Sequence, residues 1–258
     1  MNDAANEAVL TETRDGVLII TINRPEAKNA VNGAVAAGIA AALDRLDGED
    51  DLRVGVLTGA GGTVSAGMDL KAFLAGEVPI VEGRGLGGLT EAPPRKPLIA
   101  AVEGWALAGG FELMLACDLV VAAQTAKFGV PEVKRALVAG AGAALLLPQR
   151  IPRTIALELL LTGEPIEAPR AAELGLVNRV TDEGAALDGA LALAATIAAN
   201  GPLAVAVTKQ IAHGAPDWTL AEGWQRQGEL MMSVFGSEDA QEGARAFAEK
   251  RDPVWKGR

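Results

Sequence analysis

Short apolar runs alternate along the first half of the chain with segments whose apolar residues recur at helical spacing. The run at residues 17–23 (VLIITIN) is rich in β-branched side chains and stops at Arg24-Pro25, which is typical of a buried strand closed by a turn. The first predicted helix has one apolar face, formed by Val31, Val35, Ile39, Leu43 and Leu46. The pattern also predicts strands over residues 53–58, 97–103 and 118–123 and a helix over 109–117. Strands that alternate with helices indicate an α/β fold.

The balance changes after residue 152, where helical patterns dominate. Helices are predicted over residues 154–161, 169–174, 185–199, 203–212, 220–235 and 238–250, and only 176–180 is strand-like. We therefore expect a core over residues 1–195 and a C-terminal helical region over 196–258. Residues 76–96 have neither period and are rich in Gly and Pro, which is typical of either a surface insertion or a lid.

The charge balance argues against two classes of partner. The 258 residues include 23 Lys and Arg against 33 Asp and Glu, a formal net charge of −10, and no basic block is present. Nucleic-acid binding depends on cationic side chains, and anionic lipid repels an acidic chain, so neither partner is expected. The start, MNDAANEAVLTETRD, lacks the apolar stretch of a secretory signal, and no apolar run reaches about 18 residues. We expect a cytoplasmic protein that does not enter the membrane.

Three features that suggest chemistry have simpler explanations. Gly83, Gly85 and Gly88 match G-x-G-x-x-G, but no strand precedes them and no helix starts there, so a dinucleotide site is not expected. His213 is expected to end a helix, and Cys117 is expected to be a small core residue. One His and one Cys cannot form a Cys/His zinc cluster or an internal disulfide, so we expect no metal.

Two segments of the chain share a design that suits catalysis by backbone groups. In each, a buried strand runs into small residues and then into a helix: residues 54–59 lead to 65–70, and residues 98–104 lead to 108–112. Amides at such helix starts carry a partial positive charge, and two that face each other form an oxyanion hole. Glu112 lies one helical turn after Gly109, and Glu132 follows the rigid Pro131. Spacing alone does not show that the two glutamates meet, and a lone glutamate is usually a surface group.

Several motifs in order resemble those of a known superfamily. They are SAGMDLK at 65–71, AVEGWALAGGFEL at 101–113, CD at 117–118 and FGVPE at 128–132, with NRPEAKN at 23–29. Together they resemble the signatures of the enoyl-CoA hydratase/isomerase, or crotonase, superfamily from residue 17 to the C-terminus. Residues 147–152 and 237–253 look most like its carnitinyl-CoA dehydratase branch.

The resemblance implies a fold, an assembly and a set of site residues. The fold would be a crotonase-like spiral of ββα units with C-terminal helices used for trimerisation, in a homo-oligomer that is a trimer or a dimer of trimers. Gly109 and Met68 match the oxyanion-hole amides, Glu112 the acid that activates water, and Glu132 the acid that exchanges a proton at the α-carbon. The residues that match the acyl-CoA-binding positions are Arg24, Lys28, Ala66, Asp69, Leu70 and Lys71.

The implied function is that of an enoyl-CoA hydratase, a lyase that reversibly adds water in syn fashion to a 2-enoyl-CoA thioester in fatty acid metabolism. Two acids and two amides suffice for this reaction, so no cofactor is expected. Carnitinyl-CoA dehydration and Δ3-Δ2-enoyl-CoA isomerisation remain alternatives, as does an acyl-CoA-binding relic; some members of the superfamily bind RNA, but the net charge of −10 argues against that here. Met68 is bulkier than is common at its position, and residues 134–142 follow the hydratase pattern only in part, which leaves the acyl-chain preference open.

Overall fold

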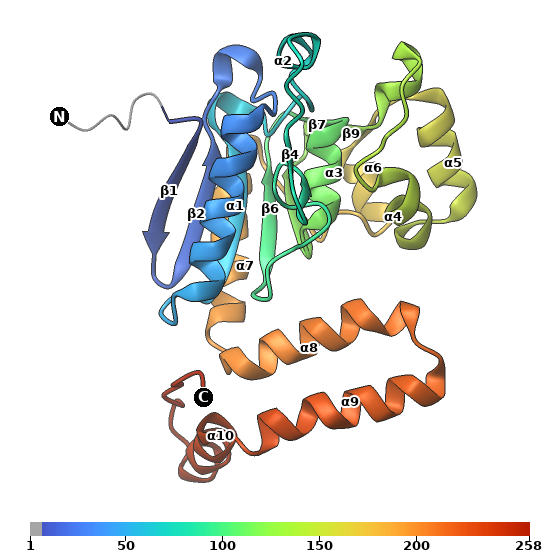
Figure 1. Cartoon of the computed structure of the whole chain (residues 1–258). Helices are drawn as coiled ribbons and strands as arrows, with labels where there is room; N and C mark the ends of the chain where they lie inside the picture. Colours follow the sequence, from blue (N-terminus) through green and yellow to red (C-terminus); the bar gives the residue numbers. More distant parts are fainter. Residues whose placement is uncertain (1–6) are drawn as a thin grey trace, which may run out of the picture.

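A six-stranded sheet forms the centre of the computed structural model, which describes residues 7–258 (Figure 1). The strand order is β1-β2-β3-β6-β8-β11, and all neighbours are parallel except β1 and β2. These strands are β1 (Val9–Arg14), β2 (Val17–Ile22), β3 (Val54–Gly59), β6 (Leu98–Val102), β8 (Leu119–Ala123) and β11 (Arg179–Thr181). Parallel neighbours need crossover connections, which explains why helices separate these strands along the chain.

Helices cover both faces of this sheet. On one face lies α1 (Gly33–Gly48), which begins where the Asn32 side chain accepts a hydrogen bond from the Val35 amide. The predicted apolar stripe of α1 is buried, because Val35, Ile39, Leu43 and Leu46 are at most 1% exposed. On the other face lies α7 (Ala186–Ala198), whose alanines pack against alternate side chains of the same strands. Burial on both faces accounts for the nearly continuous apolar strands.

Smaller strands turn the chain into a spiral of repeated ββα units. After β6 the chain enters β7 (Trp105–Leu107) and then α3 (Gly109–Ala116); after β8 it enters β9 (Lys127–Gly129) and then the 3-10 helix η4 (Pro131–Arg135). β7 and β9 join β10 (Ile166–Glu167) in a second sheet of order β10-β9-β7. The first unit follows the same path, since Ser65 bridges to Ala106 before α2 (Leu70–Leu74). The predicted α/β spiral is therefore confirmed.

β1 and α4 are among the elements that were not expected from the sequence. β1 is an edge strand with four exposed residues, so its sequence lacks an apolar run. α4 (Ala143–Arg150) contains Pro148 and follows Gly142, two signals that normally argue against a helix. The expected helices after it are confirmed as α5 (Arg153–Thr162) and α6 (Ala168–Glu173). The expectation about the chain start lies partly in residues 1–6, outside the described residues.

The glycine-rich segment at residues 76–96 folds as a packed loop with a short hairpin, β4 (Ile80–Val81) and β5 (Gly85–Leu86). Residues 85–89 are buried. Gly85 and Gly88 have positive φ angles, and a Cβ on Gly88 would lie 2.6 Å from the carbonyl oxygen of Ala36 in α1. Gly88, the last glycine of the G-x-G-x-x-G match, therefore allows close backbone packing against α1.

The C-terminal helices project below the sheet and have little contact with it (Figure 1). They are α8 (Pro202–Gly214), η5 (Ala215–Asp217), α9 (Leu220–Phe235) and α10 (Glu238–Glu249). Two further 3-10 helices, η2 (Pro25–Ala27) and η3 (Ala60–Gly62), lie far from them in the sequence, in the first quarter of the chain. α8 and α9 contain no buried residue. The boundary near residue 195 falls within α7, and the division into a core and a helical region stays a prediction.

Three contacts tie α8 to the sheet and its edge. Lys209 Nζ donates to Asp118 at 2.6 Å and to the Lys96 carbonyl at 3.0 Å, and His213 Nε2 pairs with Asp118 at 2.7 Å. Asp118 also accepts from the Leu98 amide at 2.8 Å. His213 lies in the last turn of α8, as expected, and Cys117 is fully buried. Within residues 7–258 no single helix is long and apolar enough to cross a membrane; α7 and the segment 202–217 pass that test only as a pair bent by 107°.

Candidate active site

Met68 lies in a turn that backbone hydrogen bonds hold on both sides. The Val31 amide donates to the Gly67 carbonyl, and the Asp69 amide donates to the Val31 carbonyl, both at 2.8 Å. These two bonds fix the peptide planes that flank Met68. The Met68 amide itself donates to no other protein group in residues 7–258.

Gly109 opens α3 directly opposite this turn. The residue before it, Ala108, has φ +50° and ψ −127°, a conformation that costs free energy for a residue with a Cβ. Ala108 is held there because its amide donates to Gly129 and its carbonyl accepts from Phe111 and Glu112. The Gly109 amide, like that of Met68, has no protein acceptor among the described residues.

The two free amides are close neighbours. A Cβ built on Gly109 would lie 3.4 Å from the Met68 nitrogen, and one built on Gly67 would lie 3.0 Å from the Gly109 nitrogen. The next residue, Gly110, packs so tightly that its Cβ would come within 2.4 Å of the Ser65 carbonyl oxygen. The structure thus brings together the two predicted donors, and the glycines make their approach possible. Two converging amides at a helix start can stabilise one oxyanion.

Glu112 extends from the first turn of α3 and is only 3% exposed. Its Oε1 accepts hydrogen bonds from the Ala141 amide at 2.8 Å and the Ala143 amide at 3.1 Å. Burial raises the pKa of Glu112 above the usual carboxyl value, although these two hydrogen bonds act in the opposite direction. The alanine amides are site residues that the sequence did not indicate, because backbone donors in an irregular loop leave no side-chain pattern.

Glu132 lies in the first turn of η4, which is closed at its start by Pro131. Its Oε2 is buried and has no hydrogen-bond partner within residues 7–258. Burial is the main cause that raises the pKa of Glu132, and the negative charge of Glu112 raises it further. The charge of Glu112 thus acts on Glu132, which spacing alone did not establish. A buried, unpaired carboxyl oxygen is a group prepared for a ligand or a proton transfer.

An apolar cavity of about 630 Å³ opens beside Glu132. α4 and α5 supply most of its wall, and the residues between η4 and α4 complete it. Leu145, Leu157 and Leu161 line it and are themselves exposed. The site therefore combines two amide donors, two acids of raised pKa and an apolar surface.

Comparisons with known proteins agree with this arrangement. Residues 12–258 match the family described as enoyl-CoA hydratase/isomerase. The chain is 43% identical over 255 residues to a carnitinyl-CoA dehydratase of Salmonella enteritidis, covering 95% of this chain and 97% of that one. The chain belongs to the enoyl-CoA hydratase/isomerase family.

Solved structures of this family share the fold over nearly the whole chain. The crystal structure of an enoyl-CoA hydratase from Mycobacterium tuberculosis has a TM-score of 0.96 and 59% identity, covering 98% of this chain and 100% of that chain. The crystal structure of a carnitinyl-CoA hydratase from Mycobacterium avium has a TM-score of 0.79 and 46% identity, again covering 98% and 100%. This chain therefore has the crotonase fold, and it belongs with enzymes of the hydro-lyase class.

The residues that match the acyl-CoA positions of the enoyl-CoA hydratase/isomerase family surround the Met68 turn. Lys28, Leu70 and Lys71 are exposed, and Ala66 is half-buried. Asp69 caps the start of α2, where its Oδ1 accepts from the Lys71 and Ala72 amides. Arg24 points inward to Asp69 at 3.0 Å. The role of each in ligand binding stays a prediction.

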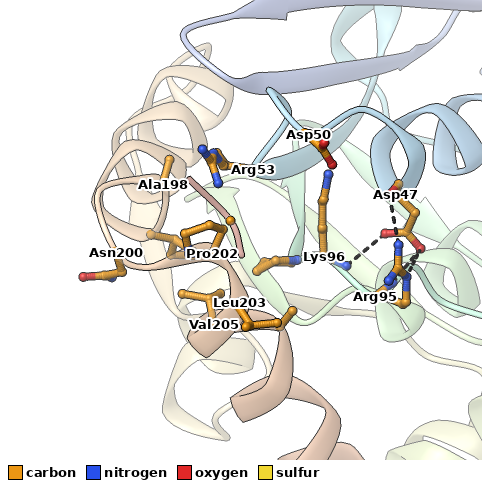
Figure 2. A pocket seen from close by; sticks show the side chains of 14 residues that line it. Asp47, Asp50, Arg53, Arg95, Lys96, Ala198, Asn200, Pro202, Leu203 and Val205 are labelled. Atoms are coloured by element: carbon orange, nitrogen blue, oxygen red, sulfur yellow. Dashed lines mark hydrogen bonds and ion pairs between the residues drawn. The ribbon is translucent and has the colours of Figure 1, made fainter. Parts of the chain in front are cut away.

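A second hollow lies at the other end of the sheet and contains none of the site residues predicted from the family (Figure 2). It has a volume of about 150 Å³ and lies between the end of α1 and the joint of α7 and α8. Asp47, one of its polar groups, accepts from the Arg95 amide at 2.8 Å and the Lys96 amide at 3.1 Å. We therefore assign the candidate active site to the amides and glutamates.

Proposed function

We propose that this chain is an enoyl-CoA hydratase that reversibly adds water, in syn fashion, to a 2-enoyl-CoA thioester. The observation that carries the proposal is the close pair of unpaired amides of Met68 and Gly109, together with the buried Glu112 and the half-buried Glu132, whose Oε2 has no partner among the described residues. Family membership and 59% identity to a protein named enoyl-CoA hydratase support it.

The thioester oxygen binds between the two amides. Addition of water at the β-carbon moves negative charge onto this oxygen, so donors that are already in place stabilise the transition state. Loss of one such donor in other oxyanion holes costs about 3 to 4 kcal/mol of activation free energy. The positive partial charge at the start of α3 adds to this stabilisation.

Glu112 and Glu132 divide the proton transfers between them. Glu112, held by two alanine amides, binds and activates the water, and Glu132 exchanges the proton at the α-carbon. A general acid or base is most effective when its pKa lies near the working pH, and both carboxyl groups have raised pKa values. The residues present carry out this chemistry without a cofactor.

The CoA portion binds along the exposed edge of the Met68 turn. Lys28 and Lys71 supply positive charge to the phosphates, and Ala66 leaves room for the chain that connects them to the thioester. The acyl group lies toward the apolar cavity beside Glu132. The pathway we propose is fatty acid metabolism in the cytoplasm.

We also propose a homo-oligomer, as a trimer or a dimer of trimers. α9 exposes an apolar stripe that nothing else in the described chain covers: Leu220, Trp224, Met232 and Phe235, each at least 62% exposed. The surface of α4 and α5 is also apolar, with Leu145 73% and Leu161 72% exposed. Such patches are typical of protein interfaces.

Dehydration of a carnitine-type thioester is the second candidate, because the Salmonella relative is named carnitinyl-CoA dehydratase. The same amides and acids serve that reaction, with a trimethylammonium group on the acyl chain. Isomerisation between Δ3 and Δ2 enoyl-CoA differs in that it needs only one base.

A turnover panel tests the proposal. Short, medium and carnitine-type 2-enoyl-CoA thioesters are incubated with the protein while the absorbance of the conjugated enoyl group is followed. We expect rapid loss of absorbance with at least one uncharged substrate and a much slower reaction with the Glu112→Gln variant. Turnover of the carnitine-type substrate alone favours the second candidate. Tight acyl-CoA binding with no turnover of any substrate contradicts both reactions.

A further inference from the structure

Arg24 is directed away from the exposed surface, toward the turn that carries Met68. A single nitrogen, Nη1, lies 2.6 Å from the Ala30 carbonyl oxygen and 3.0 Å from Asp69 Oδ2. The side chains of Arg24 and Asp69 are only 20% and 13% exposed. A partly buried ion pair of this kind constrains geometry more strongly than a surface pair does.

Asp69 connects this ion pair to Met68, its chain neighbour. The Asp69 amide donates to Val31, while its Oδ1 caps α2. One carboxylate oxygen is therefore held by Arg24 and the other by the start of a helix. The Met68 amide itself lies in the preceding peptide, whose Gly67 carbonyl accepts from Val31, so the Asp69 contacts hold Met68 from its other side.

Asn29 anchors the other side of the same pair. It is fully buried; its Oδ1 accepts from the Arg24 amide at 2.8 Å, and its Nδ2 donates to the Ala60 and Thr63 carbonyls at 2.8 and 2.6 Å. The Asn29 carbonyl accepts from Ser65 Oγ at 2.8 Å. Asn29 thus joins the segment 24–31 to residues 60–65, and Arg24 joins the same segment to Asp69.

We propose that the Arg24–Asp69 ion pair is a positioning device that keeps the Met68 amide aimed at the point on which the Gly109 amide also converges. This inference rests on the proposed function. It assigns Arg24 a role different from the CoA contact that its family position implies. Because Nη1 makes both contacts, a lysine at position 24 is able to replace it, whereas an uncharged side chain is not.

The test compares Arg24→Met, Asp69→Asn, the double variant and Arg24→Lys. A surface control is Arg45→Met, which breaks the exposed Arg45–Glu49 pair. We expect kcat to fall by up to about 100-fold in the two single variants, with little change in KM or in the affinity for free CoA. The double variant loses no more than the worse single variant, because both remove one contact. Arg24→Lys restores most of the rate, and the control is unchanged.

Two spectroscopic measurements report on the amide itself. The infrared stretch of the labelled thioester carbonyl of saturated butyryl-CoA falls on binding to the original chain, and we expect this shift to shrink in Arg24→Met. In the free protein labelled with 15N-methionine, the Met68 amide peak, assigned with Met68→Leu, moves in Arg24→Met and in Asp69→Asn. Thermal unfolding identifies any variant that fails to fold.

These measurements distinguish failure of the inference from failure of the proposed function. If the original chain hydrates no enoyl-CoA, the proposed function fails, and the Met68 amide peak still tests the positioning role. A CoA contact by Arg24 instead predicts a large rise in KM and weaker binding of free CoA, with no dependence on Asp69. That result, or an unmoved Met68 peak in both single variants, overturns the inference.

Discussion

The candidate site and the exposed helix α9 use glycine in opposite ways. Around the site, a Cβ on Gly67 would come within 2.7 Å of Ala108 Cβ, and one on Gly110 would come within 2.4 Å of the Ser65 oxygen. In α9, a Cβ on Gly228 would meet nothing within 4 Å, and one on Gly223 would make an ordinary contact with the Trp218 ring at 3.8 Å. The site is built by segments whose backbones pack closely against each other. In contrast, α9 leaves an exposed surface that another molecule can cover.

This difference separates two kinds of constraint. At the site, the peptides beside the two amides and the carboxyl group of Glu112 are fixed by contacts within the described chain, so small changes alter catalysis. In α8 and α9, no residue is buried, so their stability depends on the few contacts with the sheet and on the proposed partner copy. Substitutions in the two regions are therefore expected to have different consequences.

The largest effect is expected from the two acids at the site. Glu112→Gln and Glu132→Gln each remove a proton-transfer group and should lower kcat for hydration by about 10²- to 10⁴-fold. Steady-state rates on the best substrate of the panel measure this loss. A loss with Glu112→Gln alone indicates a one-base isomerase, and intact hydration in both variants refutes the two-acid mechanism.

Glu112→Gln should not destabilise the fold. The raised pKa of Glu112 means that the folded state disfavours its charged form, so ionisation costs stability once the pH exceeds the unfolded carboxyl pKa of about 4.3. Gln retains an oxygen for the two alanine amides without that charge. At pH 7 the Glu112→Gln variant is expected to be at least as stable as the original chain. Any gain in the free energy of unfolding should disappear below about pH 4.3. Urea unfolding at several pH values measures this difference.

The next effect concerns Asp118, at the junction of the two regions. Asp118→Asn leaves Lys209, 11% exposed, without its buried counter-charge, and we expect it to lower the free energy of unfolding by about 3 kcal/mol. A rise or no change in stability contradicts the importance of this junction. Arg45→Met, in an exposed ion pair, serves as the control and should change stability by less than about 1 kcal/mol.

The effect of Asp118→Asn should depend on pH in a defined direction. Burial alone would raise the pKa of Asp118, but hydrogen bonds from His213, Lys209 and Leu98 outweigh it and lower the pKa. A carboxyl of lowered pKa contributes stability above its unfolded pKa of about 3.9 and loses it as the pH falls through the folded value. The stability gap between the two proteins should therefore be largest near neutral pH and shrink below about pH 4.

Gly110→Ala tests the close packing at the site. The new Cβ collides with the Ser65 backbone, so either α3 or the Met68 turn must move, and we expect a loss of about 2 to 3 kcal/mol in stability together with reduced kcat. Thermal unfolding and the turnover assay measure the two losses. Unchanged values for both would show that the amides tolerate displacement.

The smallest effect is expected from Gly223→Ala, the same substitution made in α9. Alanine lowers the entropy of the unfolded chain and meets only the Trp218 ring, so stability should rise by about 0.5 to 1 kcal/mol. The turnover rate should stay the same. Destabilisation instead of a gain would show that this face of α9 is already occupied in solution.

The sequence predicted most of the fold because its strongest signals are local. Apolar periodicity located the buried face of α1, and the run of residues 17–23 became β2 within one residue. It missed β1, where an exposed edge strand has no apolar run, and α4, where a proline interrupts the helical signal. In both cases packing decided the structure against local preference.

The candidate site was predicted in part. Small residues before two helices indicated an oxyanion hole, and the resemblance to the family assigned its amides to Met68 and Gly109 and the acids to Glu112 and Glu132. Whether Glu112 and Glu132 meet depends on how α3 and η4 are placed relative to each other, which no local pattern encodes. The inward direction of Arg24 could not be predicted either, because it depends on Asp69, 45 residues away.

The most direct test of the central claim is a crystal structure of the protein with a saturated acyl-CoA. We predict that the thioester oxygen lies about 2.7 to 3.1 Å from both the Met68 and Gly109 nitrogens. The β-carbon should face the carboxyl groups of Glu112 and Glu132 across the space of one water molecule. A thioester bound away from these amides, or glutamates on opposite sides of the acyl group, would contradict the account.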